Sequence, residues 1–305
     1  MTLPSTIHFT GIGSPVCSSL AIHLHKKGFI VSGSDESFSD FSVTELRAAG
    51  MMPDRTGWFS EKIKPTVEAV IISSQVKDDN PEIQQAQALG IPVYFYPELV
   101  YQLAQDKQRI VIAGSRGRTN LTALLIHTLR YFNRPVDYLV ESPIHWLSGH
   151  IALSDAPLMI IEGLELSGPQ NKKAGFLHYH HHIGVITSIN WEPTGTYASE
   201  EEYVAQFDAF ADNTPKAGIL LYNENNTLAS VIGAKHRTDV TSVPFKIHPH
   251  NSESGKHFVL TGSERVPVKV FGTQNFESMA AARELLRRIG IPVEKFYEAL
   301  PHFNI

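Results

Sequence analysis

Apolar segments of two kinds alternate along the first hundred residues of the chain. Short β-branched and aromatic runs predict strands, at Thr6–Thr10, Phe29–Gly33, Ala69–Ser73 and Ile91–Tyr96. Apolar residues at helical spacing predict helices between them, at Ser18–Lys27, Val43–Ala49 and Pro81–Leu89. Strands that alternate with helices in this way favour a parallel sheet with helices packed against it.

The same alternation begins again after the polar stretch Gln105–Gln108. Strands are predicted at Arg109–Ala113, Leu158–Glu162, Gly184–Ile189 and Gly218–Tyr222, and shorter β segments at Phe258–Thr261 and Val266–Phe271. Helices are predicted at Leu121–Tyr131, Glu200–Phe210, Asn275–Ile289 and Val293–Ala299. The sequence therefore predicts an α/β protein of two domains, residues 1–106 and 107–305, both built on mainly parallel sheets.

Composition narrows the class of protein. With 42% hydrophobic and 19% charged residues, the chain is expected to be a soluble globular protein. A formal net charge of −5 and the lack of a long basic run argue against nucleic acid as a partner. Cys17 is the only cysteine, which excludes an internal disulfide and indicates a reducing cytoplasm. No apolar run approaches the roughly 20 residues of a membrane span, and we expect neither a signal segment nor a membrane partner.

A glycine-rich turn follows the first predicted strand. Gly11-Ile12-Gly13-Ser14 lies between that strand and a predicted helix, where glycine lets the backbone approach a diphosphate in a Rossmann-like domain. Asp35, at the end of the second strand, is placed to bind a ribose or a base. Val16 stands where the usual fingerprint has its third glycine. The turn therefore predicts either a dinucleotide or sugar-nucleotide site, or a tight turn only.

A second glycine-rich loop, Gly114–Thr119 (GSRGRT), follows the strand at Arg109–Ala113. Backbone N–H groups at the start of a helix bind phosphate oxygens, so this layout indicates a P-loop-type site for a nucleoside triphosphate. Thr119 is placed to bind Mg²⁺ through its hydroxyl. Arg118 stands where such loops carry lysine, and its bulky planar guanidinium is no neutral replacement for a lysine point charge.

Several of these residues have a structural alternative. Arg118 either contacts phosphate or forms an ion pair. Asp35 also suits a helix cap or a solvated turn. The run His178–His182 (HYHHH) gathers four of the 15 histidines, and it is either a metal site or a polar lead-in to the following strand.

Several motifs together resemble the Mur ligases, which build the peptide stem of peptidoglycan by ATP-dependent amide bond formation. In the first predicted domain the resemblance lies in Gly11–Ala21, Val31–Asp35, Ser73–Glu82 and Gly90–Val93. In the second it lies in Ala113–Thr119, Glu162–Ser167, His178–Asn190, Phe207–Pro215, Gly218–Tyr222, Gly272–Ala282 and Ala299–Ile305. The chain looks closest to the subgroups that attach L-alanine or a recycled tripeptide to UDP-N-acetylmuramate.

The resemblance implies a ligand for each domain. A UDP-sugar would be bound in the first domain by Gly11, Ile12, Gly13, Ser14, Asp35, Ser73 and Ser74. ATP would be bound in the second by Gly114, Ser115, Arg116, Gly117, Arg118, Thr119, Asn120, Gln274 and Asn275. Thr119 and Glu165 match the family's Mg²⁺ ligands, and Arg118 and Glu165 occupy its catalytic positions. ATP and Mg²⁺ are therefore the implied cofactors. Without the resemblance, Glu165 is equally a surface carboxylate.

The match to the family is incomplete at the catalytic positions. Arg118 replaces the loop lysine, Pro193 falls at the metal-binding histidine, and Gly195 falls at the aspartate that follows it. Gln274 and Ser278 replace a histidine and an asparagine on the adenine side. The family's third domain, which carries the amino-acid or peptide site, is expected to begin just beyond the last residue of this chain and is absent from it.

Three functions are left open by the sequence. The first is an ATP-dependent ligase that joins an amino acid or peptide to UDP-N-acetylmuramate, with its third domain in another chain or in a longer native protein. The second is a UDP-sugar-binding homologue with impaired catalysis, and the third is a structural protein on the same scaffold. Because the substitutions fall on the ATP side, we favour the second. We expect UDP-N-acetylmuramate or a related UDP-sugar as the ligand, and a cell-wall enzyme or a second copy of the chain as the protein partner.

Overall fold

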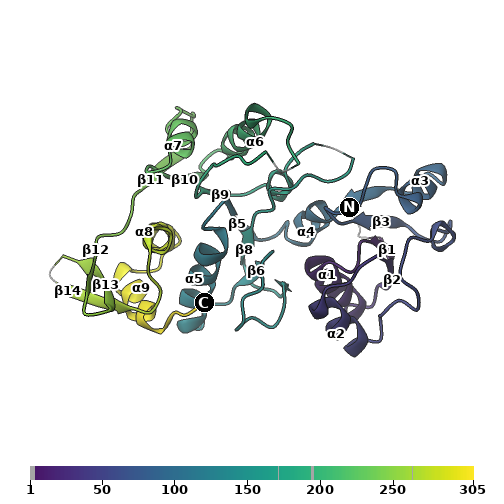
Figure 1. Ribbon diagram of the computed structural model, residues 1–305, viewed down its shortest axis with the longest axis horizontal. Helices are drawn as coiled ribbons and strands as arrows, with labels where there is room; N and C mark the ends of the chain where they lie inside the picture. The colour runs from purple at the N-terminus through teal and green to yellow at the C-terminus, as the bar shows by residue number, and fades with distance from the viewer. Residues whose placement is uncertain (1–3, 171, 194–195, 263) are drawn as a thin grey trace. The chain divides into compact units, whose positions relative to one another are not determined.

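The structure is a computed structural model of the 305-residue chain and describes residues 4–170, 172–193, 196–262 and 264–305 (Figure 1). The chain forms two compact units. The first contains the chain up to Gln105 together with Gly149–Leu153 and Leu166–Tyr179; the second contains Asp106–Ser148, Ser154–Glu165 and His180–Ile305. The polar stretch Gln105–Gln108 is therefore where the chain first passes from one unit to the other.

The first unit is built on a parallel sheet with the strand order β2-β1-β3-β4. Its strands are β1 (Thr6–Thr10), β2 (Ile30–Ser34), β3 (Ala69–Ile72) and β4 (Val93–Phe95), and the short β7 (Ile151–Ala152) also falls in this unit. Its helices are α1 (Pro15–Lys26), α2 (Asp40–Ala48), α3 (Pro81–Ala88) and α4 (Tyr96–Leu103), with 3₁₀ turns η1 (Ser60–Lys62) and η2 (Gly175–Tyr179). The central strands β1 and β3 are buried along almost their whole length, as expected for a sheet covered on both faces.

Side chains at the helix starts explain where three of these helices begin. Ser14, Ser39 and Asn80 each accept a backbone N–H from the first turn of α1, α2 and α3 in turn. Such a bond satisfies a donor that the start of a helix leaves without a partner. Pro15 and Pro81 occupy the first helical positions of α1 and α3, where no N–H is needed.

A buried carboxylate links three parts of the first unit. Glu82, in the first turn of α3, accepts hydrogen bonds from Thr10 Oγ1 (2.7 Å) and Phe59 N (2.8 Å) and lies 3.2 Å from His8 Nε2. The His8 and Glu82 side chains are fully buried. Burial alone would raise the pKa of Glu82, but the contacts with His8, Phe59 and Thr10 together hold that pKa below its ordinary value. Glu82 therefore ties β1, α3 and the segment before η1 together.

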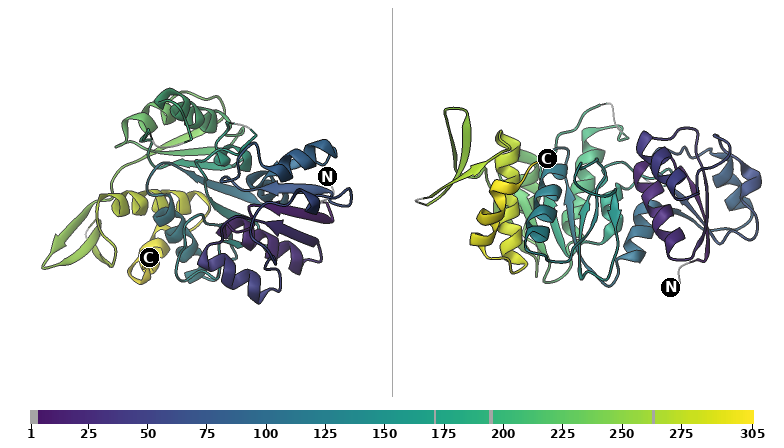
Figure 2. Two further views of the ribbon diagram at one scale, coloured as in Figure 1. Left: turned by 45° about the vertical axis from the view of Figure 1, so that its right-hand side comes forward. Right: turned by 90° about the horizontal axis from the view of Figure 1, so that it is seen from below.

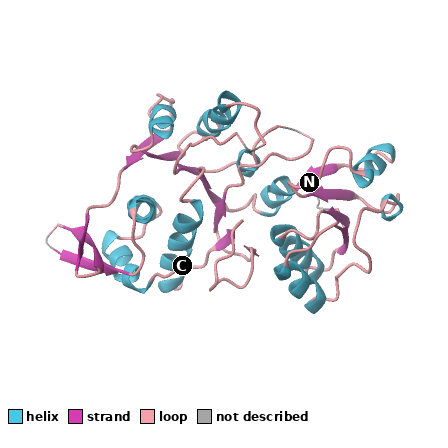
Figure 3. Ribbon diagram, viewed as in Figure 1, coloured by secondary structure: helices cyan, strands magenta, loops and turns pink. Residues whose placement is uncertain are grey.

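The second unit is built on a larger parallel sheet, whose strands run in the order β11-β10-β9-β5-β8-β6. They are β5 (Gln108–Ala113), β6 (Asp137–Leu139), β8 (Leu158–Glu162), β9 (Ile183–Ile186), β10 (Ile219–Asn223) and β11 (Thr241–Phe245). The helices of this unit are α5 (Arg118–Tyr131), α6 (Glu200–Asp212), α7 (Thr227–Gly233), α8 (Thr273–Arg288) and α9 (Val293–Ala299), followed by the 3₁₀ turn η3 (Leu300–His302) (Figure 3). Helix α5 packs against β5, β8 and α8.

A small antiparallel sheet is inserted between β11 and α8. It consists of β12 (His250–Glu253), β13 (Lys256–Thr261) and β14 (Glu264–Val268), with β13 in the middle. Figure 2 shows it extending away from the parallel sheet of the same unit. Its side chains are mostly exposed or half-buried, so this insertion adds little to the core.

The predicted fold class is confirmed, because both large sheets are parallel and helices alternate with their strands. The sequence pattern did not predict α4, β6, β7, α7, β11 or β12. Tyr96 was expected to end a strand, but it begins α4, because Pro97 lies in the first turn and Glu98 Oε2 accepts Phe95 N at 2.7 Å. Helix α7 spans only seven residues, which is too short for a helical apolar period to stand out. Among the described residues, no helix is long and apolar enough to cross a membrane.

We predict that Glu82→Gln lowers the free energy of unfolding by about 1–3 kcal/mol, because the buried donors lose their charged acceptor. Since the pKa of Glu82 is lowered, its contribution is present above the ordinary carboxyl pKa and is lost as the pH falls through the lowered value. Urea unfolding at neutral and acid pH measures both effects. Glu68→Gln is the matched control, because Glu68 is an exposed carboxylate that accepts hydrogen bonds from Ser5. Equal stability of the two variants at neutral pH would contradict the prediction.

Candidate functional site

The loop between β5 and α5 has the backbone of a phosphate-binding turn. Gly114 and Gly117 adopt positive φ angles of 141° and 86°, which favour glycine. Gly117 caps the 14-residue helix α5, so the N–H groups of Arg118, Thr119 and Asn120 have no acceptor within the helix. Donors of this kind at the positive end of a helix dipole suit an anion.

Side chains that follow β9 hold this loop in place. Thr187 Oγ1 donates to the carbonyl oxygen of Arg116 (2.6 Å), and Ser188 Oγ accepts Arg116 N (2.9 Å). Ser115 N donates to the carbonyl oxygen of Ser188 at 2.9 Å. A Cβ atom at Gly114 would overlap Thr187 Oγ1. The loop is therefore fixed by close packing against the end of β9.

The guanidinium of Arg118 folds back over the loop. Arg118 Nη1 donates to the carbonyl oxygen of Gly114 and lies 3.0 Å from Glu165 Oε1. The two side chains are only 20% and 22% exposed, and Glu165 Oε1 also accepts the Tyr203 hydroxyl at 2.9 Å. Burial raises the pKa of Glu165, and the guanidinium opposes this shift only in part. Of the two alternatives that the sequence left open for Arg118, the structure contains the ion pair.

Thr119 has a different carboxylate as its partner. Its hydroxyl donates to Glu162 Oε1 at 2.6 Å. Glu162 is fully buried at the end of β8, and its second oxygen accepts Glu141 N (2.9 Å) and Ser142 N (3.3 Å). The sequence pattern did not single out Glu162. A signal was present, however, because Glu162 ends a predicted strand at the sheet edge where ligands bind.

The two predicted Mg²⁺ ligands are therefore engaged by different groups. Glu165 is paired with a cation, and the Thr119 hydroxyl already has an acceptor. Across the described ranges of the chain, no group of three or more histidine, cysteine, aspartate or glutamate side chains is arranged to hold a metal ion. Proline offers no metal-binding group at Pro193, and Gly195 lies outside the described residues. The metal-binding role of Thr119 and Glu165 stays a prediction.

The histidine run before β9 is engaged in packing. His181 is almost completely buried, with Nε2 3.0 Å from Thr214 Oγ1 and its ring against Phe210. Burial lowers the pKa of His181 to about 3, so this imidazole is neutral. His182 Nδ1 accepts Arg109 N at 3.1 Å. These contacts agree with a polar lead-in to the strand.

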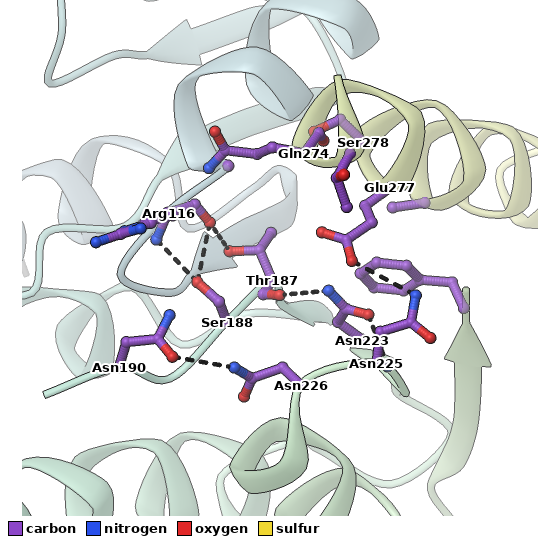
Figure 4. Close-up of a pocket in the computed structure, with 14 residues that line it drawn as sticks. Arg116, Thr187, Ser188, Asn190, Asn223, Asn225, Asn226, Gln274, Glu277 and Ser278 are labelled. Atoms are coloured by element: carbon purple, nitrogen blue, oxygen red, sulfur yellow. Dashed lines mark hydrogen bonds between the residues drawn. The ribbon is translucent and has the colours of Figure 1, made fainter. Parts of the chain in front are cut away.

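A cavity of about 270 Å³ opens beside the loop (Figure 4). Its walls come from the loop, the segments at and after the ends of β9 and β10, the end of β11 and the first half of α8. The lining includes Arg116, Ser188, Asn190, Asn225, Gln274 and Glu277. Amide, hydroxyl and carboxylate groups therefore surround a space large enough for part of a small ligand.

Internal hydrogen bonds fix several of the amides around this cavity. Asn223 Nδ2 donates to the carbonyl oxygen of Thr187 at 3.0 Å, and Asn226 Oδ1 accepts Ala229 N at 3.0 Å. Asn225 Nδ2 lies 3.5 Å from Glu277 Oε1 (Figure 4). Groups held in this way offer both donors and acceptors to a ligand, as a nucleobase edge requires.

Five of the nine predicted ATP-binding residues fall into two sets in the structure. Arg116, Gly117 and Gln274 line the cavity. Asn120 and Asn275 instead contact each other, with Asn120 Nδ2 2.7 Å from Asn275 Oδ1, and so join α5 to α8.

The sequence pattern missed the asparagines at 223, 225 and 226. They follow the predicted strand Gly218–Tyr222, at the carboxyl edge of the sheet where binding residues gather. A search for polar residues after every predicted strand would have found them.

In the glycine turn of the first unit, the backbone N–H groups donate hydrogen bonds to acceptors within the same unit. Gly11 N and Ile12 N donate to the carbonyl oxygen of Ser34 (2.9 and 3.2 Å), and Gly13 N donates to Asp35 Oδ2 (2.8 Å). Burial raises the pKa of Asp35, although the hydrogen bonds from backbone N–H groups oppose the shift. The Asp35 carboxylate therefore shapes the turn by accepting Gly13 N.

The other predicted UDP-site residues lie around the same turn. Ser14 caps α1 by accepting Cys17 N at 3.3 Å. Ser73 is buried directly after β3, where a Cβ atom at Gly11 would overlap its hydroxyl, and Ser74 is half-buried. These residues lie at the carboxyl ends of neighbouring parallel strands, which is where open α/β sheets bind ligands. Their role in binding a UDP-sugar stays a prediction.

Comparison with known proteins gives consistent matches. Residues 6–108 match the family model described as "Mur ligase family, catalytic domain". The chain is 29% identical to the UDP-N-acetylmuramate–L-alanine ligase of Carboxydothermus hydrogenoformans and 28% identical to that of Lactiplantibacillus plantarum. These alignments cover 98% and 95% of this chain but 65% and 68% of the relatives. The chain therefore spans about two thirds of the length of these relatives.

Solved structures share the fold. The UDP-N-acetylmuramate:L-alanyl-gamma-D-glutamyl-meso-diaminopimelate ligase of Neisseria meningitides matches with a TM-score of 0.85 and 20% identity, over 99% of both chains. The UDP-N-acetylmuramate-alanine ligase of Thermotoga maritima matches with a TM-score of 0.76 and 20% identity, over 98% of this chain and 68% of that one.

We predict that Gly13→Ala lowers the free energy of unfolding by about 1–3 kcal/mol, as over-packing does in other close-packed sites. The added Cβ would overlap the carbonyl oxygen of Ser37 and lie 2.8 Å from Asp35 Oδ2. Gly149→Ala is the control, because the nearest atom to its Cβ would be Phe41 Cζ at 3.8 Å. Urea unfolding should place that control within about 0.5 kcal/mol of the unmodified chain. An equally stable Gly13→Ala variant would show that the turn can open.

Proposed function

We propose that the chain is a Mur ligase family member that binds a UDP-N-acetylmuramate-type nucleotide in the synthesis or recycling of peptidoglycan. The match of residues 6–108 to the family model and the 28–29% identity to relatives across the chain support this proposal. Curated relatives across its length are named for UDP-N-acetylmuramate. The first unit would hold the UDP-sugar around the Gly11–Ser14 turn, with Asp35, Ser73 and Ser74 at its sides. The loop of the second unit would hold the phosphates of ATP at the start of α5.

The proposal that this chain is impaired as a ligase rests on the ion pair between Arg118 and Glu165. Transfer of a phosphoryl group depends on charged donors that are aimed at the phosphate. The Arg118 guanidinium is directed instead at the Gly114 carbonyl oxygen and, at 3.0 Å, at Glu165. Misdirecting one such donor typically costs about 10²–10³ in rate. We therefore infer nucleotide binding without efficient amide ligation.

An ATP-dependent ligase is the alternative function. It would join an amino acid or peptide to the UDP-N-acetylmuramoyl carboxylate through an acyl phosphate. The loop geometry favours it, because Gly117 still presents the first N–H groups of α5 and Thr119 still lies beside a buried carboxylate. Since the chain spans 65% of the length of one such relative, the site for the amine would come from outside this chain, in a longer protein or in a partner.

We place the protein in the cytoplasm, with a cell-wall enzyme or a second copy of the chain as its protein partner. Cys17 is its only cysteine and is buried, so the chain forms no internal disulfide, which fits a reducing compartment. A net charge of −5 does not favour nucleic acid.

We predict that UDP-N-acetylmuramate binds the chain more tightly than ATP, because the substitutions fall on the ATP side. Isothermal titration calorimetry measures both affinities. Asp35→Asn should weaken UDP-N-acetylmuramate binding by about tenfold, equal to 1.4 kcal/mol, and leave ATP binding unchanged. Glu284→Gln, in the second unit, is the control and should change neither affinity. Failure of both ligands to bind would favour a purely structural protein.

We predict no Mg²⁺-dependent release of ADP when the chain is incubated with ATP, UDP-N-acetylmuramate and a stem amino acid or tripeptide. The physical reason is the misdirected guanidinium together with proline at the position of a metal-binding histidine. A coupled ADP assay measures the rate, with an active Mur ligase as the positive control. The double substitution Arg118→Lys and Pro193→His should increase Mg–ATP binding. Sustained turnover by the unmodified chain would establish the alternative function.

A further inference from the structure

The cavity beside the loop of the second unit has an apolar wall and a polar end. Phe245, at the end of β11, and Ala281, in α8, line the cavity and are both buried. Figure 4 shows Arg116 of the loop on one side and Glu277 with Asn225 on the other. A nucleotide whose phosphates bind the loop would therefore place its base beside Glu277 and Asn225. Since an aromatic face stacks on any base, the choice of base depends on these polar groups.

Hydrogen bonds within the protein fix other amides around the cavity. Asn223 donates to the carbonyl oxygen of Thr187 and accepts Asn225 N, both at 3.0 Å. Asn226 Oδ1 accepts two backbone N–H groups, at 3.0 and 3.2 Å. These contacts use part of the hydrogen-bonding capacity of the two amides and hold both in one orientation.

The Glu277 carboxylate keeps nearly all of its capacity. Within the described ranges, its one hydrogen bond comes from Asn225 Nδ2 at 3.5 Å, a length at which such a bond is weak. A carboxylate has about four acceptor sites. Gln274 also lines the cavity, but it lies at the phosphate end, because a Cβ atom at Gly117 would be 3.6 Å from its side chain. The base end therefore presents one amide donor beside two carboxylate acceptors.

Guanine is the base that matches this arrangement. Its Watson–Crick edge carries the acceptor O6, followed by the donors N1–H and N2–H. One carboxylate can accept both N–H groups as a bidentate pair, and an amide N–H beside it can donate to O6. Adenine offers the carboxylate a single donor, its N6 amino group, and places the N1 lone pair next to it. Cytosine has the same limitation as adenine.

We propose that the cavity selects a guanine base, with the two Glu277 oxygens accepting N1–H and N2–H and Asn225 Nδ2 donating to O6. The long bond between Asn225 and Glu277 is exchanged for these contacts when the base binds. The nucleotide held at the loop is then GTP and not ATP. The proposal rests on nucleotide binding by the second unit in the proposed function, and it names the base.

Titration calorimetry of the whole chain with GTP, ITP and ATP in buffer containing Mg²⁺ tests the proposal. GTP should bind about tenfold or more tightly than ATP, because one more hydrogen bond reaches a charged acceptor. The base of ITP keeps O6 and N1–H but lacks the N2 amino group, so its affinity should fall between the two. Equal affinities for GTP and ATP, or a higher affinity for ATP, would overturn the proposal.

Glu277→Gln should reverse the preference. A glutamine amide offers one donor and one acceptor, which suits adenine. The affinity for GTP should fall by about tenfold, whereas the affinity for ATP should rise by about two- to fivefold. A fall of equal size for both nucleotides would overturn the proposal, because it would show that Glu277 does not distinguish the bases.

Glu224→Gln is the matched control. Glu224 precedes Asn225 in the chain, pairs with Lys246 at 3.4 Å and is not part of the cavity lining. The substitution removes the same charge, and both affinities should stay within about twofold of the unmodified chain. Thermal unfolding by circular dichroism checks that Glu277→Gln is folded. If it is not, the comparison of GTP, ITP and ATP on the unmodified chain decides.

Titration of the same samples with UDP-N-acetylmuramate separates this proposal from the proposed function. If UDP-N-acetylmuramate binds while GTP binds no more tightly than ATP, the guanine proposal is overturned and UDP-sugar binding stands. If GTP binds more tightly than ATP while UDP-N-acetylmuramate does not bind, the guanine proposal stands and UDP-sugar binding fails.

Discussion

The parallel pairing of β5 with β8 on one side and β9 on the other sets the geometry of the second unit. Strands that run in the same direction end at the same edge of the sheet. The loop after β5 therefore meets Glu162 at the end of β8 and Thr187 after β9. Both contacts, Thr119 to Glu162 at 2.6 Å and Thr187 to Arg116 at 2.6 Å, bridge different strand ends. Without this register the loop would lose its supports.

Two carboxylates lie at this edge of the sheet, and each has its own set of partners. Glu162 is surrounded by neutral donors, a hydroxyl and two backbone N–H groups. Glu165 faces a guanidinium and a phenol. The architecture matches that of solved ligases with 20% sequence identity.

The sequence predicted most of the fold because apolar periodicity reports burial directly, as in β1 and β8, whose predicted bounds agree with the structure. It missed α7 because seven residues carry too little periodicity. For the site, the loop could be read from glycine spacing. The pairing of Arg118 with Glu165, 47 positions later in the numbering, could not, because it depends on which strand ends meet. Asp35 was predicted from its place at the end of a strand, but its hydrogen bond to Gly13 N follows only from the folded turn.

Close packing between Gly114 and Thr187 limits how this loop can drift during evolution. Any side chain at position 114 would overlap the threonine hydroxyl and would also need a φ of 141°. Selection for folding alone would then preserve the glycine, whether or not phosphate is transferred. In proteins descended from this one, a glycine in the loop would therefore indicate only that the loop still folds. The residue at position 118 would indicate which chemistry the loop supports.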